Sequence, residues 1–124
     1  MAGTIAADTL THSTAGSLGT QFVVQGSAKV WGHLNGTGTN IAIRDSFNVS
    51  GATDHGTGDF SFAFTSSMSN ANWNGNLMDI RNRATTPGFN FDATTGAGNC
   101  RWTTYDVSAA DYDHTGALIV GDLA

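Results

Sequence analysis

Four histidines are the residues of this chain best suited to binding a metal. His33, His55 and His114 lie on separate predicted elements, and the tetrapeptide 111–114 (Asp-Tyr-Asp-His) places two carboxylates beside an imidazole. Zinc sites typically use closely spaced histidines and calcium loops span twelve residues, and neither pattern is present. We therefore predict no metal in one subunit and a solvated loop at 111–114, although a symmetry axis could gather copies of one histidine.

Hydrolytic catalysis would need a nucleophile beside a base, or a pair of carboxyl groups, in a pocket. Asp54-His55 and the many serines supply the residue types, but the chain has no Gly-x-Ser-x-Gly motif and no glutamate. The pairs Gly36-x-Gly38 and Gly56-x-Gly58 resemble phosphate loops, yet each leads into a predicted strand and not into a helix. The expectation is a protein that is not an enzyme and uses no cofactor.

Aromatic side chains are the candidates for binding a sugar. Their flat faces could stack on pyranose rings, but packing in the core or between subunits is favoured, because few other large side chains are available to fill a core. The single cysteine, Cys100, excludes an internal disulfide and is predicted to be a small, half-buried residue, not a reactive thiol. The candidates for ligand stacking are Trp73, Trp102, Tyr105 and Tyr112.

The composition points to a chain that packs against copies of itself. Charged residues make up 12% of the chain, against about 25% in an average soluble protein. A surface of Ser, Thr, Asn and Gly suits an assembled protein better than a free monomer, which normally keeps itself soluble with charge. Five Lys and Arg against ten acidic residues cannot form a stripe for nucleic acid. Without a long apolar run or an export signal, we also expect no membrane insertion.

Short alternating runs separated by glycine clusters predict antiparallel strands joined by tight turns. In the strand predicted at 59–65, Phe60, Phe62 and Phe64 share one face, which needs a partner sheet to cover it. Asn35-Gly36 is predicted to be a two-residue hairpin turn, and the glycine-rich stretch 54–59 a second turn. These features predict an all-β protein.

The remaining chain extends this pattern. One strand is expected at 68–80 with a bulge at Gly75, or alternatively a hairpin turning at Asn74-Gly75; residues 81–99 read as a loop, and 109–114 as a helical turn or loop. Together the elements predict an antiparallel β-sandwich or jelly roll of about 7–8 strands over residues 20–124. The other predicted strands are 20–25, 28–34, 41–43 continuing into 47–49, 101–108, and a central one at 115–121.

Residues 1–19 form a separate predicted element, an extended anchoring arm. Ile5, Leu10 and Leu18 are too widely spaced for one helix face, and such a segment buries little by itself. We expect these three residues to form an assembly interface, with the arm lying along another subunit or an adjoining protein.

Three stretches of the chain carry a recognisable pattern. They are Ala-Lys-x-Trp and Asn-Gly-Thr-Gly-Thr within 28–39, Ala-Ile-Arg-Asp-Ser-Phe-Asn-Val-Ser at 42–50, and Thr-Asp-x-Gly-Thr-Gly-Asp-Phe at 53–60. With these motifs the chain resembles a β-rich module found in surface proteins of tailed bacteriophages of marine bacteria. Residues 4–18 resemble the usual lead-in and 120–124 the usual end. His33, Leu34 and His55 depart from the residues common in that module, without disturbing its strands and turns.

This resemblance implies a virion structural protein displayed on the particle surface, as a tail fibre or tip or as a capsid decoration or fibre, assembled in the host cytoplasm. The expected partners are two further copies in a homotrimer, other virion proteins bound through the arm, and a host-surface glycan. No catalytic residue comes with the resemblance. The alternative is a free carbohydrate-binding module of a host enzyme, which would need an export signal or a fused catalytic domain.

Overall fold

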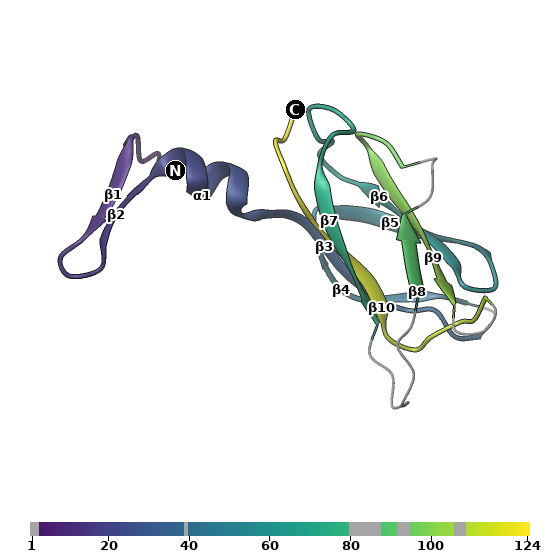
Figure 1. The fold of residues 1–124 in the computed structure, drawn as a ribbon. Coiled ribbons are helices and arrows are strands. Elements are labelled where there is room, and N and C mark those ends of the chain that lie inside the picture. The colour runs from purple at the N-terminus through teal and green to yellow at the C-terminus, as the bar shows by residue number, and fades with distance from the viewer. Residues whose placement is uncertain (1–2, 39, 80–87, 92–94, 106–108) are drawn as a thin grey trace.

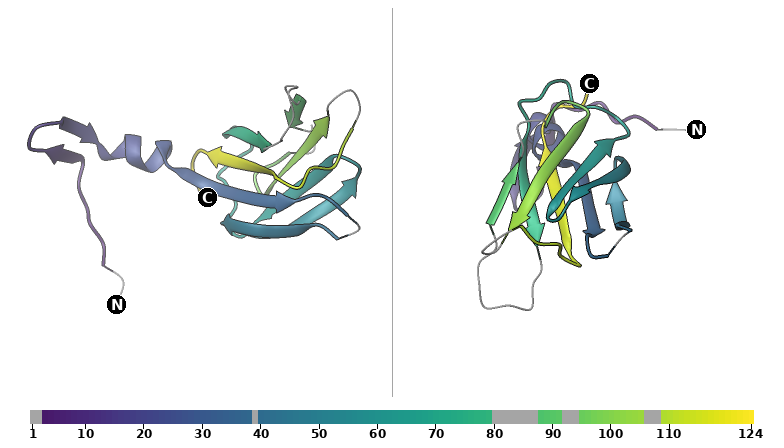
Figure 2. Two further views of the ribbon diagram at one scale, coloured as in Figure 1. Left: turned by 90° about the horizontal axis from the view of Figure 1, so that it is seen from below. Right: turned by 90° about the vertical axis from the view of Figure 1, so that its right-hand side faces the viewer.

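Two antiparallel sheets and a projecting N-terminal segment make up the molecule (Figure 1). One sheet has the strand order β4-β3-β10-β7 and the other the order β5-β6-β9-β8; they stack as the two layers of a sandwich (Figure 2). The predicted all-β sandwich is confirmed. The computed structural model describes residues 3–38, 40–79, 88–91, 95–105 and 109–124.

The sandwich begins at β3 and continues to the last strand of the chain. Before it come a two-stranded hairpin, β1 (Thr9–His12) with β2 (Gly16–Gly19), and the helix α1 (Thr20–Gly26). None of the helices in the described part of the chain is long and apolar enough to span a membrane. The sandwich strands are β3 (Ala28–Asn35), β4 (Ala42–Phe47), β5 (Val49–Gly56), β6 (Asp59–Phe64), β7 (Asn74–Asp79), β8 (Gly88–Phe91), β9 (Asn99–Tyr105) and β10 (Thr115–Val120).

The core lies between the two sheets, where the alternation in the sequence directs the apolar side chains. Phe60 and Phe62 are fully buried and Phe64 is 7% exposed, so the predicted inward face of this strand is confirmed. The Phe62 ring lies 4.8 Å from the Trp102 ring, centroid to centroid. A Cβ on Gly32 of the opposite sheet would lie 2.5 Å from the Phe62 ring, so glycine makes room there. The facing sheet contributes Val30, Leu34, Ala117 and Ile119.

One of the two predicted turns is confirmed, and the other is wrong. Between β5 and β6 the chain turns at Thr57-Gly58, inside the glycine-rich stretch expected to turn. Asn35-Gly36 is not a two-residue hairpin, because Asn35 itself still pairs with Ala42 as part of β3. The Asn35 side chain instead accepts hydrogen bonds from the amide and hydroxyl of Thr37 at 3.1 and 2.8 Å, which favours a wider loop.

Two strand predictions and one loop prediction are wrong. Residues 20–25 are helical and lie outside both sheets. Strand β7 begins only at Asn74, and Gly75 pairs with Ile119 in continuous register, which excludes both the bulge and the hairpin. The predicted loop 81–99 contains β8, because β9 offers it an unpaired edge beyond β6. Residues 106–108 of the strand predicted at 101–108 lie outside the described residues.

The chain crosses from one sheet to the other at Asn48. The sequence predicted strand segments at 41–43 and 47–49, whereas the structure has β4 ending at Phe47 and β5 starting at Val49 in the second sheet. Asn48 adopts φ +58°, a conformation that asparagine tolerates better than most residues. Its side chain holds Ser66 from both sides, accepting from the Ser66 amide at 2.7 Å and donating to the Ser66 carbonyl at 2.9 Å.

Candidate functional site

An apolar row crosses the outer face of the β4-β3-β10-β7 sheet. Val30 and Leu34 point inward from β3, so Trp31 between them points outward. The strand register places Trp31 opposite Phe47 of β4 and opposite Leu118 of β10. Directly opposite side chains on antiparallel strands contact one another. We call Phe47, Trp31 and Leu118 the apolar row; Phe47 is 53% exposed.

A pocket of about 270 Å³ opens beside the apolar row. The strand register places His33 opposite Gly116, and a Cβ at Gly116 would lie 2.0 Å from the Gly32 carbonyl oxygen, so glycine is needed there for the two strands to approach. The walls and floor are formed by Trp31, Gly32, His33, Asp45, His114, Thr115, Ala117 and Leu118.

Two histidines form one wall of this pocket. His33 Nε2 and His114 Nδ1 are 2.8 Å apart, and the rings stack with centroids 4.9 Å apart. One of these nitrogens must donate a proton and the other accept it, so both cannot be protonated while the bond persists. Burial lowers the pKa of His33, and His114 and Arg44 lower it further. The His33 ring in this wall is thus uncharged at neutral pH.

The histidine pair corrects the expectation that His33 and His114 stand apart. They are distant in sequence, and only the pairing of β3 with β10 brings them together. Asp113 Oδ2 lies 3.6 Å from His114 Nε2 on the side away from His33. Among the described residues, no group of three or more His, Cys, Asp or Glu side chains could hold a metal ion.

The aromatic residues predicted to stack on sugars have other surroundings. Trp102 is fully buried, and its indole N–H donates to Thr115 Oγ1 at 3.1 Å, so it packs in the core, which was the favoured role, and is not available to stack on a sugar. Trp73 is half-buried against Phe64, and its indole N–H donates to the Gly96 carbonyl at 2.9 Å. Tyr112 is half-buried. The side chain of Tyr105 lies outside the described residues.

Cys100 is more deeply buried than expected. It is 0% exposed in β9, not half-buried, because it faces the opposite sheet along with Trp102. Burial raises the pKa of its thiol to about 12. The reactive thiolate is therefore negligible at neutral pH.

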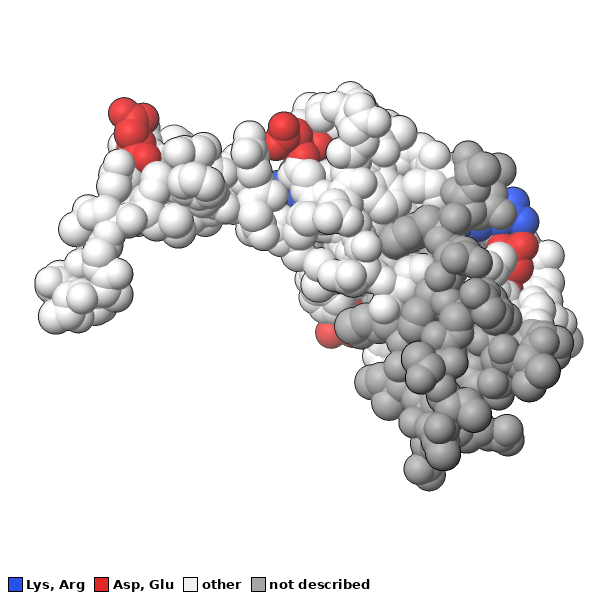
Figure 3. Space-filling view, viewed as in Figure 1, with Lys and Arg blue, Asp and Glu red and all other residues white. Residues whose placement is uncertain are grey.

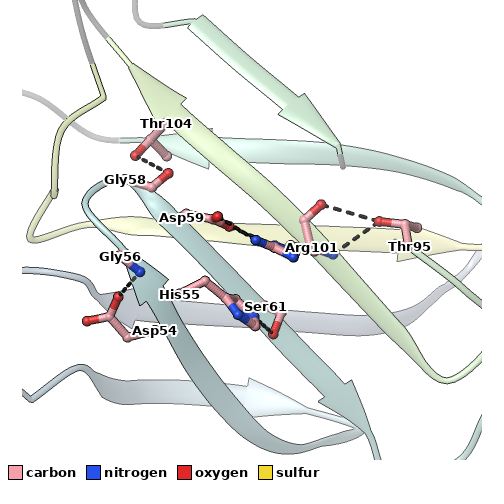
Figure 4. A network of polar contacts seen from close by, with 9 residues as sticks. All are labelled: Asp54, His55, Gly56, Gly58, Asp59, Ser61, Thr95, Arg101 and Thr104. Atoms are coloured by element: carbon pink, nitrogen blue, oxygen red, sulfur yellow. Dashed lines mark hydrogen bonds and ion pairs between the residues drawn. The ribbon is translucent and has the colours of Figure 1, made fainter. Parts of the chain in front are cut away.

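The outer face of the other sheet is polar (Figure 4). Arg101 binds Asp59 through two hydrogen bonds of 2.9 and 2.7 Å across β6 and β9. His55 Nε2 lies 2.9 Å from Ser61 Oγ, but the carboxylate of the neighbouring Asp54 accepts instead from the Gly56 amide. This side of the sandwich thus lacks the apolar character of the row around Trp31.

Most of the exposed large apolar side chains in the described part of the chain lie in the N-terminal segment, residues 3–27. We call this segment the arm; it projects from one end of the sandwich (Figure 1). Helix α1 has no buried residue, and the arm contains one formally charged side chain, Asp8, so its visible surface is almost free of charge (Figure 3). The exposed fractions are Ile5 90%, Leu10 48%, Leu18 47%, Phe22 62%, Val23 41% and Val24 60%.

The first three of these residues were predicted to form an interface, and the last three were missed. Phe22, Val23 and Val24 were assigned to a strand inside the sandwich, because β-branched and aromatic residues favour strands. The Gly26-Ser27 pair that follows is a signal for a helix end that could have separated them from β3.

Lys29 holds the arm at the start of β3. This residue is 9% exposed, and its ammonium donates to the carbonyl of Val24, to the carbonyl of Ser27 at 2.9 Å and to Ser27 Oγ at 2.7 Å. Cations at the C-terminal end of a helix satisfy carbonyls left without a partner inside the helix. The direction in which α1 leaves the sandwich is therefore set by a buried contact.

Comparisons of the chain with protein-family models, with curated proteins and with solved structures found no match. Any functional assignment therefore depends on the arm, the apolar row and the pocket.

Proposed function

We propose that this protein is a structural component of a bacteriophage virion, displayed on the particle surface as a homotrimer and attached through its N-terminal arm. The observation that carries the proposal is the arm, which leaves six large apolar side chains exposed in a single copy. The resemblance of residues 28–64 to a phage surface module supports the virion as its location. Tail fibre or tip and capsid decoration or fibre are the two positions that this reading allows.

Helix α1 supports the requirement for a partner. It has seven residues, no side-chain cap at its start and no buried side chain. Isolated helices shorter than about 12–15 residues are marginal in water, and α1 also contains three β-branched residues, Thr20, Val23 and Val24, which lower helix propensity. A helix of this kind is stable only when its apolar residues pack against something outside the single copy.

The free carbohydrate-binding module is the competing function, and the arm argues against it. A free module would expose an apolar segment to water without using it, which is an aggregation hazard. Host-surface glycan binding remains part of the virion proposal as its adhesive function. Of the aromatic residues predicted for it, Trp73 and Tyr112 keep partial access to solvent.

The native mass of the full chain tests the assembly half of this proposal. Light scattering over a concentration series should give a trimer, and Phe22→Asp should shift the protein to monomer. Gln21→Asp places the same charge on the neighbouring exposed position of α1 and should preserve the trimer. A wild-type chain that stays monomeric at all concentrations would refute assembly.

The location on the virion needs a separate test. Purified particles of the phage that encodes this chain should contain it by mass spectrometry, and gold-labelled antibody should mark intact particles. Label on the tail or on the head would decide between the two positions. Particles that lack the protein after purification would exclude a structural role in the virion.

A further inference from the structure

Two apolar surfaces of this chain have no partner among the described residues of one copy. One is the arm, and the other is the apolar row with its adjoining pocket on the β4-β3-β10-β7 sheet. The opposite outer face of the sandwich is polar, with the Asp59–Arg101 ion pair and the His55–Ser61 contact. The arm is therefore an apolar segment exposed to solvent, and the apolar row is an apolar face that could pack against it.

The arm does not cover this face of its own copy. It leaves the sandwich at the start of β3 and extends away from both sheets (Figures 1 and 2). Lys29 fixes this direction by bonding the last turn of α1. Within one copy α1 packs mainly against β2 and buries none of its residues. The two surfaces can meet only if the arm reaches a different copy.

We infer that the arm of one copy packs across the apolar row of a second copy and places Phe22 in the pocket beside Trp31. The inference rests on the proposed assembly and names its contact surface. Such a contact joins two different surfaces, so repeating it produces a ring when the rotation closes. Three copies would then each give one arm and receive one.

The chemistry of the pocket fits an aromatic side chain. Phe22 is the largest exposed apolar side chain of the arm, and the pocket offers it the Trp31 indole and the stacked imidazoles of His33 and His114. Aromatic rings gain from edge or offset contacts beyond the area that they bury. Since the His33–His114 bond keeps at least one ring nitrogen unprotonated, an apolar occupant does not have to desolvate two cations.

The size and charge of the arm also fit such a contact. The arm contains about 25 residues, and stable interfaces use about 20–30 residues on each side. Helix α1 contains no charged residue, so it meets no like charge from Asp45 at the pocket. A polar ligand such as a sugar would instead leave much of the arm uncovered.

Engineered disulfides test the contact directly, because the one natural cysteine cannot compete. Cys100 is fully buried and its thiol pKa is about 12. With Phe22→Cys and Leu118→Cys in one chain, mild oxidation should link copies into covalent trimers, seen on a denaturing gel without reductant. Phe22→Cys with Thr53→Cys is the matched control, since Thr53 is exposed on the outer face of the other sheet, and it should stay unlinked.

Trp31→Ala gives a second measurement that needs no new bond. If the indole is a main contact, the dissociation constant of the oligomer should rise about 30-fold. Thr53→Ala should leave that constant unchanged. Circular dichroism of each variant checks that the sandwich remains folded, since Trp31 lies outside the core cluster.

The outcomes separate this inference from the proposed function. Normal trimer formation by Trp31→Ala would overturn the arm contact. Equal crosslinking through Thr53→Cys would do the same. Neither result would contradict the proposed assembly. A monomeric wild type would overturn both. A saccharide panel that binds the wild-type oligomer, with binding lost in Trp31→Ala, would show the pocket open in the assembly and would also overturn the inference.

Discussion

Gly58 shows how tightly single residues are constrained at the β5–β6 turn. Its φ is +70°, a region that residues with a Cβ rarely adopt. A Cβ at this position would also lie 2.4 Å from the Thr104 carbonyl oxygen. That carbonyl belongs to β9, so the turn is pressed against a neighbouring strand and cannot move away easily.

Gly58→Ala should therefore lower the free energy of unfolding by about 2–4 kcal/mol, the sum of backbone strain and the displaced contact. Chemical denaturation of the purified variant measures this value. Gly51→Ala is the control, because Gly51 lies in β5 with open space around its Cβ position and no positive φ. A loss for Gly58→Ala no larger than that of the control would contradict the assignment of the turn.

The histidine pair predicts a pH dependence of stability. The pKa of His33 is lowered in the fold, chiefly by burial, so between its folded and unfolded values the unfolded chain binds more protons. The free energy of unfolding that neutral His33 contributes is fully present above about pH 6.5, the ordinary pKa of histidine. It is lost as the pH falls toward the lower pKa of His33 in the folded protein. His33→Asn should flatten the stability curve in this window, whereas Ser46→Ala on β4 should not.

Thermal melts at a series of pH values measure this effect. The other titratable groups are common to both proteins, so the difference between the two curves reports on His33. Equal slopes for wild type and His33→Asn between about pH 7 and pH 5.5 would show that His33 does not contribute.

At the scale of elements, the junction between α1 and β3 controls where the arm points. The Lys29 ammonium has three acceptors on the last turn of α1 and on Ser27. Hydrogen bonds to a charged group contribute about 1.5–3 kcal/mol each. Loss of this ammonium should release the helix end without removing the aliphatic stem that packs at the start of the sheet.

Lys29→Met should accelerate amide hydrogen exchange in residues 20–28 by about 10-fold or more, the equivalent of about 1.5 kcal/mol. Mass spectrometry of peptides from the exchanged protein measures this change. Gln25→Met alters an exposed residue of the same helix and is the control. Unchanged exchange in Lys29→Met would mean that the ammonium does not hold α1.

A helix or strand can be predicted from the sequence when the residues that determine it are neighbours in the chain. The alternation of Phe60, Phe62 and Phe64 identifies a strand and its buried face without further information. The run at 22–24 carries the same residue types, but α1 has no neighbouring strand with which to pair, and the chain forms a helix there. Strand β8 shows the converse, since a loop-like sequence pairs because β9 offers it an edge.

At the scale of the whole molecule, an arm that is covered only between copies couples folding to assembly. A partner that binds only the folded state raises the melting temperature, and the rise grows with the partner's concentration. Here the partner is a second copy of the chain. The melting temperature should therefore rise by about 3–5 °C for each tenfold increase in protein concentration.

Scanning calorimetry over two decades of concentration tests this expectation. Phe22→Asp should remove the dependence, because its monomer exposes the arm at every concentration. A wild-type melting temperature that does not change with concentration would mean that the arm contributes no stability through assembly.

The amino-acid sequence by itself determined the strand faces, the β5–β6 turn and the low charge, because these depend on near neighbours and on composition. Only the tertiary structure decided that β3 lies beside β10, that His33 meets His114, and that a pocket opens beside Trp31 and His33. The physical reason is that alternation specifies which side of a strand is buried, but not which distant strand it pairs with. That pairing depends on the packing of the whole chain.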